Sequence, residues 1–102
     1  MIARVSSFEG VNIAAAKETM DEAEAIIRPS IEALDGVRGV MQLVADNGKV
    51  LAITLFDSDA AATAAEPFFD EELPKMLGHI FQAWEGRRTA VDHYDVVVDT
   101  RL

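Results

Sequence analysis

The fold is decided by residues 37–56, which read VRGVMQLVADNGKVLAITLF. Two apolar, β-favouring runs, residues 37–45 and 49–56, flank Asp46-Asn47-Gly48. Asn-Gly is the strongest short-range hairpin signal, because glycine permits the backbone conformation of a tight turn. The stretch therefore predicts two adjacent antiparallel strands.

Within the second of these runs, residues 50–56 are apolar on both alternating faces. An antiparallel strand with one wet face alternates with polar residues, so each side of this strand needs a cover. Helices of the same chain cover one face, and the chain is too short to cover the other. The pattern predicts a second copy of the chain on the open face, and hence a homodimer.

Upstream, residues 2–8 are β-favouring and end at Glu9-Gly10, which predicts a first strand and a turn. A helix is expected next, ending near Gly36, with a bend or break about one turn before Pro29. Its apolar stripe has spacings of three and four: Ile13, Ala16, Met20, Ala23, Ile27, Ile31 and Leu34.

Downstream, Asp57-Ser58-Asp59 offers side-chain oxygens that cap a second helix. Pro67 and Pro74 interrupt it, so residues 58–83 are expected to form two or three short helical pieces. Residues 88–98 are typical of a last strand. The order is β-α-β-β-α-β, which predicts a ferredoxin-like α+β domain with a four-stranded antiparallel sheet and helices on one face.

Length and composition limit the classes of protein. The 102 residues fit one domain, residues 1–102. A net charge of -9 repels nucleic acid and anionic membranes, so neither is an expected partner. No apolar run reaches the roughly 18 to 20 residues of a membrane span, and no signal peptide is recognisable. The chain has no cysteine, which fits a cytoplasmic location.

Aromatic residues gather in the broken second helix, where Phe68, Phe69, Phe81 and Trp84 supply four of the chain's seven aromatic residues. They either pack against the sheet as core or form the wall of an apolar ligand pocket, because large rigid rings line concave sites. In the second case His79 is the candidate catalytic acid or base. Arg4 and Arg38 are then the candidate polar contacts of the ligand.

Other patterns predict no dedicated chemistry. His79 and His93 lie fourteen residues apart without the spacing of a metal motif, so no metal site is expected. Gly36 and Gly39 precede a strand and not a helix, which excludes a phosphate-binding loop. Asp57 and Asp59 are expected to be helix caps, with a catalytic carboxylate pair as the alternative.

Three motifs resemble the antibiotic-biosynthesis-monooxygenase-like group of dimeric α+β barrels. They are Gly36-Val37-Arg38-Gly39-Val40 at the start of the second strand, Thr54-Leu55-Phe56-Asp57-Ser58-Asp59-Ala60-Ala61 at the junction with the second helix, and Tyr94-Asp95-Val96-Val97 in the last strand. The resemblance spans nearly the whole chain and implies the fold of that group. The group includes cofactor-free oxygenases of polyketide quinones and haem-degrading enzymes.

The haem-degrading members have an asparagine, a tryptophan and a histidine at positions that fall here on Ser6, Ala65 and His79. Only the histidine matches. The quinone-oxidising members have a pocket tryptophan, and Trp84 lies outside that register. The resemblance thus implies no cofactor.

Two hypotheses of function remain. In the first, a cofactor-free dimeric barrel binds a small, apolar, aromatic or quinone-like molecule and acts as a monooxygenase. In the second, the domain is a non-catalytic dimerisation or ligand-binding module whose apolar sheet face only makes the dimer.

Overall fold

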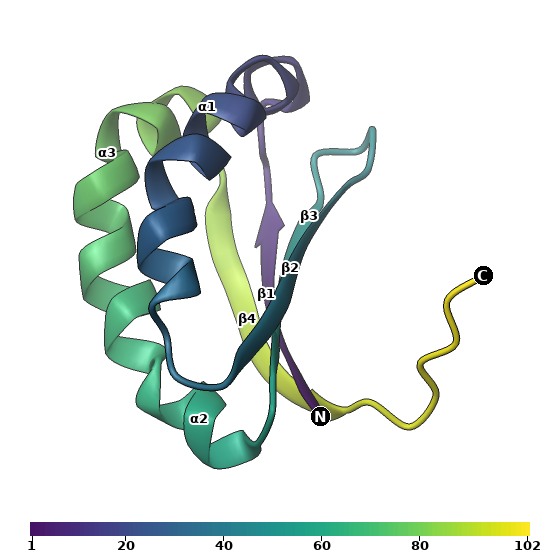
Figure 1. Ribbon diagram of the computed structural model, residues 1–102. Coiled ribbons are helices and arrows are strands. Elements are labelled where there is room, and N and C mark those ends of the chain that lie inside the picture. The colour runs from purple at the N-terminus through teal and green to yellow at the C-terminus, as the bar shows by residue number, and fades with distance from the viewer.

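The computed structural model describes residues 1–102 as two layers, with helices packed on one face of a sheet (Figure 1). The strand order is β2-β3-β1-β4, and every neighbouring pair is antiparallel. This confirms the predicted ferredoxin-like order. The strands are β1 (Ile2–Glu9), β2 (Val37–Val44), β3 (Val50–Phe56) and β4 (Arg87–Asp95), and the two longer helices are α1 (Ile13–Glu32) and α3 (Leu73–Trp84).

The predicted hairpin is present between β2 and β3. Val44 pairs with Val50, and Ala45 N–H donates to the carbonyl of Lys49 at 2.9 Å. Gly48 has a φ angle of +87°, which is unfavourable for residues with a side chain. The Asn47 side chain accepts a hydrogen bond from the backbone of Lys49 at 3.2 Å. The turn therefore follows from its sequence.

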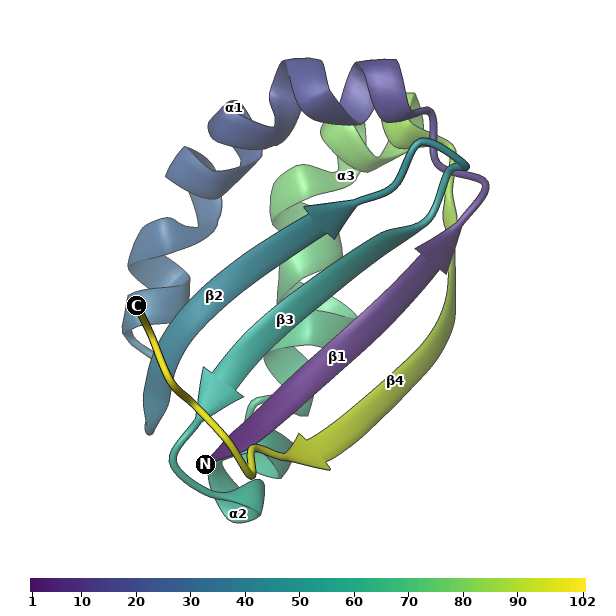
Figure 2. The same ribbon diagram turned by 90° about the vertical axis from the view of Figure 1, so that its right-hand side faces the viewer.

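Helix α1 begins at an asparagine cap, because the Asn12 side chain accepts from Ala15 N–H at 3.1 Å. Pro29 lies inside the helix, which is continuous through it and curves as it passes over the sheet (Figure 2). The sequence predicts either a bend or a break near Pro29, and the helix is not broken there. Gly36, with a φ of +75°, follows the helix and leads into β2.

The second helical region is divided as predicted. It consists of α2 (Asp59–Ala64), a π-helical turn η1 (Phe68–Glu72) and α3. The Ser58 hydroxyl caps α2 by accepting from Ala61 N–H at 3.2 Å. Pro67 lies between α2 and η1, whereas Pro74 is in the first turn of α3, directly after the π-helical turn.

The last strand is shorter than the sequence predicts. Strand β4 ends at Asp95, and Val97 and Val98 lie outside it, 87% and 78% exposed. Strand β4 pairs with β1, which begins at Ile2, and Val96 N–H makes a last bond to the Met1 carbonyl at 3.0 Å. The predicted continuation to residue 98 is wrong, because the pairing with β1 ends at Asp95 and Val97 and Val98 lie outside the sheet.

The core lies between the helices and the sheet. Phe56, fully buried at the end of β3, packs against Ile31 of α1 and Phe69 of η1. Leu77 and Ile80 of α3 pack against Ala23 of α1. None of the helices is both long enough and apolar enough to cross a membrane.

Candidate functional site

A cavity of about 300 Å³ lies between the sheet and the helices, and it is called the inner cavity below. All four strands, α1, η1 and α3 contribute to it. Its wall is largely apolar and aromatic, with a few polar side chains on the strands. The lining residues are Arg4, Ser6, Phe8, Ile27, Ile31, Val40, Gln42, Ala52, Thr54, Phe69, Asp70, Leu73, Pro74, Phe81 and Arg88.

Arg4 provides the charge at the sheet side of this cavity and is 2% exposed. Its Nε donates to Glu66 Oε1 at 2.7 Å, and its Nη2 donates to Glu66 Oε2 at 3.0 Å. The third contact is from Nη1 to the Ser6 hydroxyl oxygen at 2.7 Å. Such a bidentate pair fixes the guanidinium, and burial without it would be costly.

The Phe69 ring covers the guanidinium of Arg4, with Cζ 3.8 Å from the ring centroid. Phe69 in turn meets the Phe56 ring edge to face, with centroids 6.5 Å apart. A cation over an aromatic face is stabilised by the ring quadrupole, more strongly when both are removed from water. The aromatic wall and the charged group are thus one packed unit.

His93 of β4 extends the Arg4–Glu66 pair towards α2. Its Nδ1 lies 2.8 Å from Asp59 Oδ1, and its Nε2 lies 3.2 Å from Glu66 Oε1. The hydrogen bond with Asp59 is the main reason that the pKa of His93 is raised. The Arg4 hydrogen bonds are the main reason that the pKa of Glu66 is lowered.

A second ion pair lies at the rim of the inner cavity. Arg88 of β4 donates from Nη1 to Asp70 Oδ1 of η1 at 2.9 Å. Both side chains are partly exposed, at 41% and 47%. The pair bridges the sheet and the π-helical turn at the edge of the cavity.

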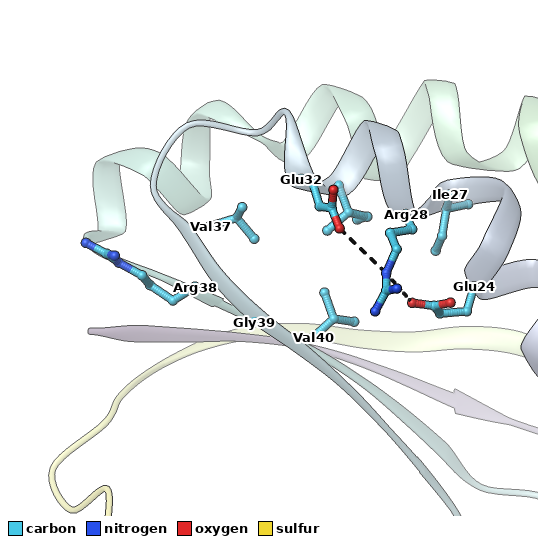
Figure 3. Close-up of a pocket in the computed structure, with 9 residues that line it drawn as sticks. Glu24, Ile27, Arg28, Glu32, Val37, Arg38, Gly39 and Val40 are labelled. Atoms are coloured by element: carbon cyan, nitrogen blue, oxygen red, sulfur yellow. Dashed lines mark ion pairs between the residues drawn. The ribbon is translucent and has the colours of Figure 1, made fainter.

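A second pocket of about 400 Å³ lies between α1 and the start of β2, and it is called the outer pocket (Figure 3). It shares Ile27, Ile31 and Val40 with the inner cavity, so the two spaces adjoin. Arg28 lies across it between two carboxylates of α1, at 2.9 Å from Glu24 and 3.6 Å from Glu32. Val40 is 45% exposed because these spaces open over it.

Three of the predicted ligand-pocket residues, Arg4, Phe69 and Phe81, line the inner cavity. Arg38 lines the outer pocket instead, where it forms an ion pair with Asp57 that raises its pKa. Phe68 packs on the core cluster around Phe56, with its ring centroid 5.3 Å from that of Phe69.

The other two predicted site residues lie away from these spaces. Trp84 is half-buried against α1, and its indole Nε1 donates to the Thr19 hydroxyl at 2.7 Å. His79 is exposed on α3 and lines neither the inner cavity nor the outer pocket.

Sequence reasoning missed Glu66, Thr54 and Gln42. Alternation along β1 places Arg4 and Ser6 on one face, and the strand register adds Thr54 opposite Arg4. That signal requires the pairing of β1 with β3. Glu66 had no local signal, because it stands between Ala65 and Pro67 and its partner is 62 residues away. No group of three His, Asp or Glu side chains is arranged to hold a metal ion.

Known structures share this fold over nearly the whole chain. A protein from Bordetella bronchiseptica, provisionally named an antibiotic biosynthesis monooxygenase, aligns with a TM-score of 0.69 and 15% identity over 95% of this chain and 97% of its own. The haem-degrader MhuD from Mycobacterium tuberculosis, with two haems bound in its active site, aligns with a TM-score of 0.60 and 20% identity over 99% and 100%.

The chain has the fold of the antibiotic-biosynthesis-monooxygenase-like group. A dimeric ferredoxin-like protein from an uncultured marine organism aligns as well, with a TM-score of 0.64 and 8% identity over the full length of both chains. No family model and no curated protein matches the sequence. At these identities the likeness establishes the fold, and function has to be argued from the site.

The three residues at the haem-associated positions lie in different parts of the fold. Ser6 lines the inner cavity, Ala65 is buried in the core, and His79 is exposed on α3. The one residue type that matches the haem-degrading members therefore does not face the cavity.

Proposed function

We propose that the inner cavity binds a small, largely apolar, aromatic or quinone-like molecule without a cofactor. The observation that carries the proposal is the combination of aromatic walls with a few fixed polar groups. Phe8, Phe69 and Phe81 supply rings, and Ser6 and Thr54 supply hydroxyl groups on adjacent strands. Ligand sites typically have this composition, in which apolar walls give affinity and a few polar groups give orientation.

The activity that we propose is a monooxygenase reaction without a cofactor, and the similar structures provisionally named antibiotic biosynthesis monooxygenases support the monooxygenase part of it. In such a reaction an anthrone reduces dioxygen itself, so that one oxygen atom becomes the new carbonyl and the other leaves as water. His79 was the sequence candidate for the acid or base. Its exposed position makes Ser6 and the Arg4–Glu66 pair the better polar candidates.

Oxygen uptake tests this activity directly. Purified protein is mixed with an anthrone or a hydroxyquinone, and oxygen consumption is followed beside Ser6→Ala, Phe81→Ala and His79→Ala variants. We expect turnover that falls with the first two substitutions and is kept with the third. No uptake above the uncatalysed rate would refute the enzymatic proposal, and binding measured by calorimetry would then decide whether a ligand site remains.

The second candidate function is self-association through the open face of the sheet. This face is turned away from the helices (Figure 2) and has partly exposed apolar side chains. Met41 and Leu43 of β2 are 52% and 43% exposed, and Tyr94 of β4 is 53% exposed. A second copy is the occupant that we propose, and the dimeric ferredoxin-like protein of similar fold supports it.

Light scattering tests the self-association. We expect a particle of twice the 11.1 kDa chain mass, converted to the single chain by Met41→Glu with Leu43→Glu. Paired Gln82→Glu and Ala83→Glu substitutions on exposed positions of α3 add the same charge and are expected to leave the dimer intact. A monomer at every concentration in the unsubstituted protein would exclude a homodimer.

The cellular setting is proposed from composition. Absence of cysteine and a net charge of -9 support a cytoplasmic protein with neither nucleic acid nor membrane as partner. Fractionation of cells expressing a tagged chain tests this location.

A further inference from the structure

The inner cavity has no unpaired cation. Arg4 donates to both carboxylate oxygens of Glu66, at 2.7 and 3.0 Å, and its third nitrogen, Nη1, donates to the Ser6 hydroxyl oxygen. At the rim, Arg88 is bound to Asp70 at 2.9 Å. Each positive charge that lines the cavity is therefore matched by a carboxylate.

This balance holds at neutral pH. The hydrogen bonds from Arg4 lower the pKa of Glu66, so its carboxyl group is ionised. Protonation of His93 adds a positive charge at the outer side of Glu66, but Asp59 lies 2.8 Å from the same ring and compensates it. The Arg4 side of the cavity thus has no excess charge to offer to an anion.

An anionic ligand would meet two costs in this cavity. It would lose its hydration, and it would lie near the Glu66 carboxylate without a free cation to compensate. An uncharged ring meets neither cost. The Ser6 hydroxyl accepts from Arg4 and keeps its own proton for donation, and the charged donor polarises that proton.

On these grounds we infer that the cavity selects uncharged aromatic ligands bearing a carbonyl acceptor, which Ser6 binds, and that the Arg4–Glu66 pair excludes carboxylate analogues of the same shape. The inference rests on the proposed ligand-binding function and names the class of ligand. It assigns Glu66 the role of a specificity-determining residue that acts by occupying Arg4.

Naphthalene carboxamide and naphthalene carboxylate form a matched pair of probes, because they have the same ring and differ in charge. Calorimetric titration of the full chain at pH 7 is expected to give a carboxamide affinity higher by about tenfold or more. In Glu66→Gln, Arg4 is no longer neutralised. The ratio of carboxamide affinity to carboxylate affinity is then expected to fall by about tenfold or to reverse. Ser6→Ala is expected to weaken carboxamide binding by about tenfold.

Glu71→Gln is the matched control, since Glu71 is exposed on η1, lines neither space and changes the net charge equally. It should keep the ratio of the unsubstituted protein. Asp70→Asn is a second variant at the exposed rim, and it should raise carboxylate affinity by a smaller factor than Glu66→Gln. Asp70→Asn tests the effect of charge on ligand selection if the Glu66→Gln protein does not fold.

The outcomes separate the two proposals. Equal or tighter carboxylate binding by the unsubstituted protein overturns the selection for uncharged ligands while the binding function stands. An unchanged ratio in a folded Glu66→Gln protein overturns the role of Glu66. If neither probe binds, the ligand-binding function and this inference are both wrong.

Discussion

The guanidinium of Arg4 lies over the ring of Phe69, with Cζ 3.8 Å from the ring centroid. Strand β1 and the π-helical turn η1 are thereby joined across the inner cavity. The ion pair with Glu66 fixes the guanidinium from another side. Loss of Phe69 or of Glu66 would therefore leave the buried charge of Arg4 without one of the two groups that stabilise it.

Arg4→Met is expected to lower the free energy of unfolding by about 3 kcal/mol, because it leaves the Glu66 carboxylate, 28% exposed, without its main partner. Phe69→Leu should cost less, about 1 to 2 kcal/mol, because a core side chain of reduced size remains. Urea unfolding followed by circular dichroism measures both. A smaller loss for Arg4→Met than for Phe69→Leu would show that the ion pair does not stabilise the fold.

The His93 contacts predict a pH dependence of stability. Asp59 and Glu66 raise the folded-state pKa of His93 above its ordinary 6.5. The stabilisation is therefore complete below pH 6.5 and is lost as the pH rises through the raised value. The side chains are partly exposed, so we expect a change of at most about 1 kcal/mol.

Unfolding measured between pH 6 and pH 9 checks this change, with His93→Gln as the variant in which it disappears. Glu66 contributes in the opposite window. Its lowered pKa gives stability that is present above its ordinary 4.5 and is lost as the pH falls through the lowered value. A His93→Gln protein with the same slope above pH 6 would assign the effect to another group.

Gly36 is predicted to be less tolerant of a side chain than Gly10. Both have positive φ angles, +75° and +71°, so alanine is strained at either position. A Cβ at Gly36 would lie 2.9 Å from the Cβ of Ala61, whereas a Cβ at Gly10 meets nothing within 4 Å. We expect losses of about 2 kcal/mol or more for Gly36→Ala and about 1 kcal/mol for Gly10→Ala.

Thermal and urea unfolding of the two variants gives the difference. Adding Ala61→Gly to Gly36→Ala removes the close contact and should recover part of the difference. Equal losses in the two single variants would mean that the approach of α2 to the start of β2 is not tight in solution.

Thr19→Val is predicted to cost about 1 kcal/mol, since the Trp84 indole N–H loses its acceptor. Thr19→Ser keeps the hydroxyl and is the control. Trp84 is the only tryptophan, so its fluorescence reports on this contact, and urea unfolding gives the energy. Unchanged emission and stability in Thr19→Val would show that water replaces the bond.

Local sequence was enough to predict most of the fold. The Asn47-Gly48 turn and the Ser58 cap are short-range devices whose partners lie within three residues, and both occur where the sequence places them. The extent of β4 was not predictable in this way. Its last residues are as β-favouring as those before them, yet the pairing with β1 ends at Asp95.

The candidate site was predictable in part. The aromatic-rich second helical region does contribute Phe69 and Phe81 to the inner cavity, and Arg4 is there as well. His79 and Trp84 belong to the same helix but lie on other faces of it, Trp84 against Thr19 of α1. Helix rotation is set by packing on α1, which a single sequence does not specify residue by residue.

Sequence alone determined that this chain forms an α+β domain with a β2–β3 hairpin whose second strand is apolar on both sides, because turn chemistry and periodicity act within a few residues. Tertiary structure alone decided that Glu66 neutralises Arg4 and that the cavity beside them has no excess charge. These two residues lie 62 positions apart, and they meet only when β1 pairs with β3 and η1 folds across the sheet.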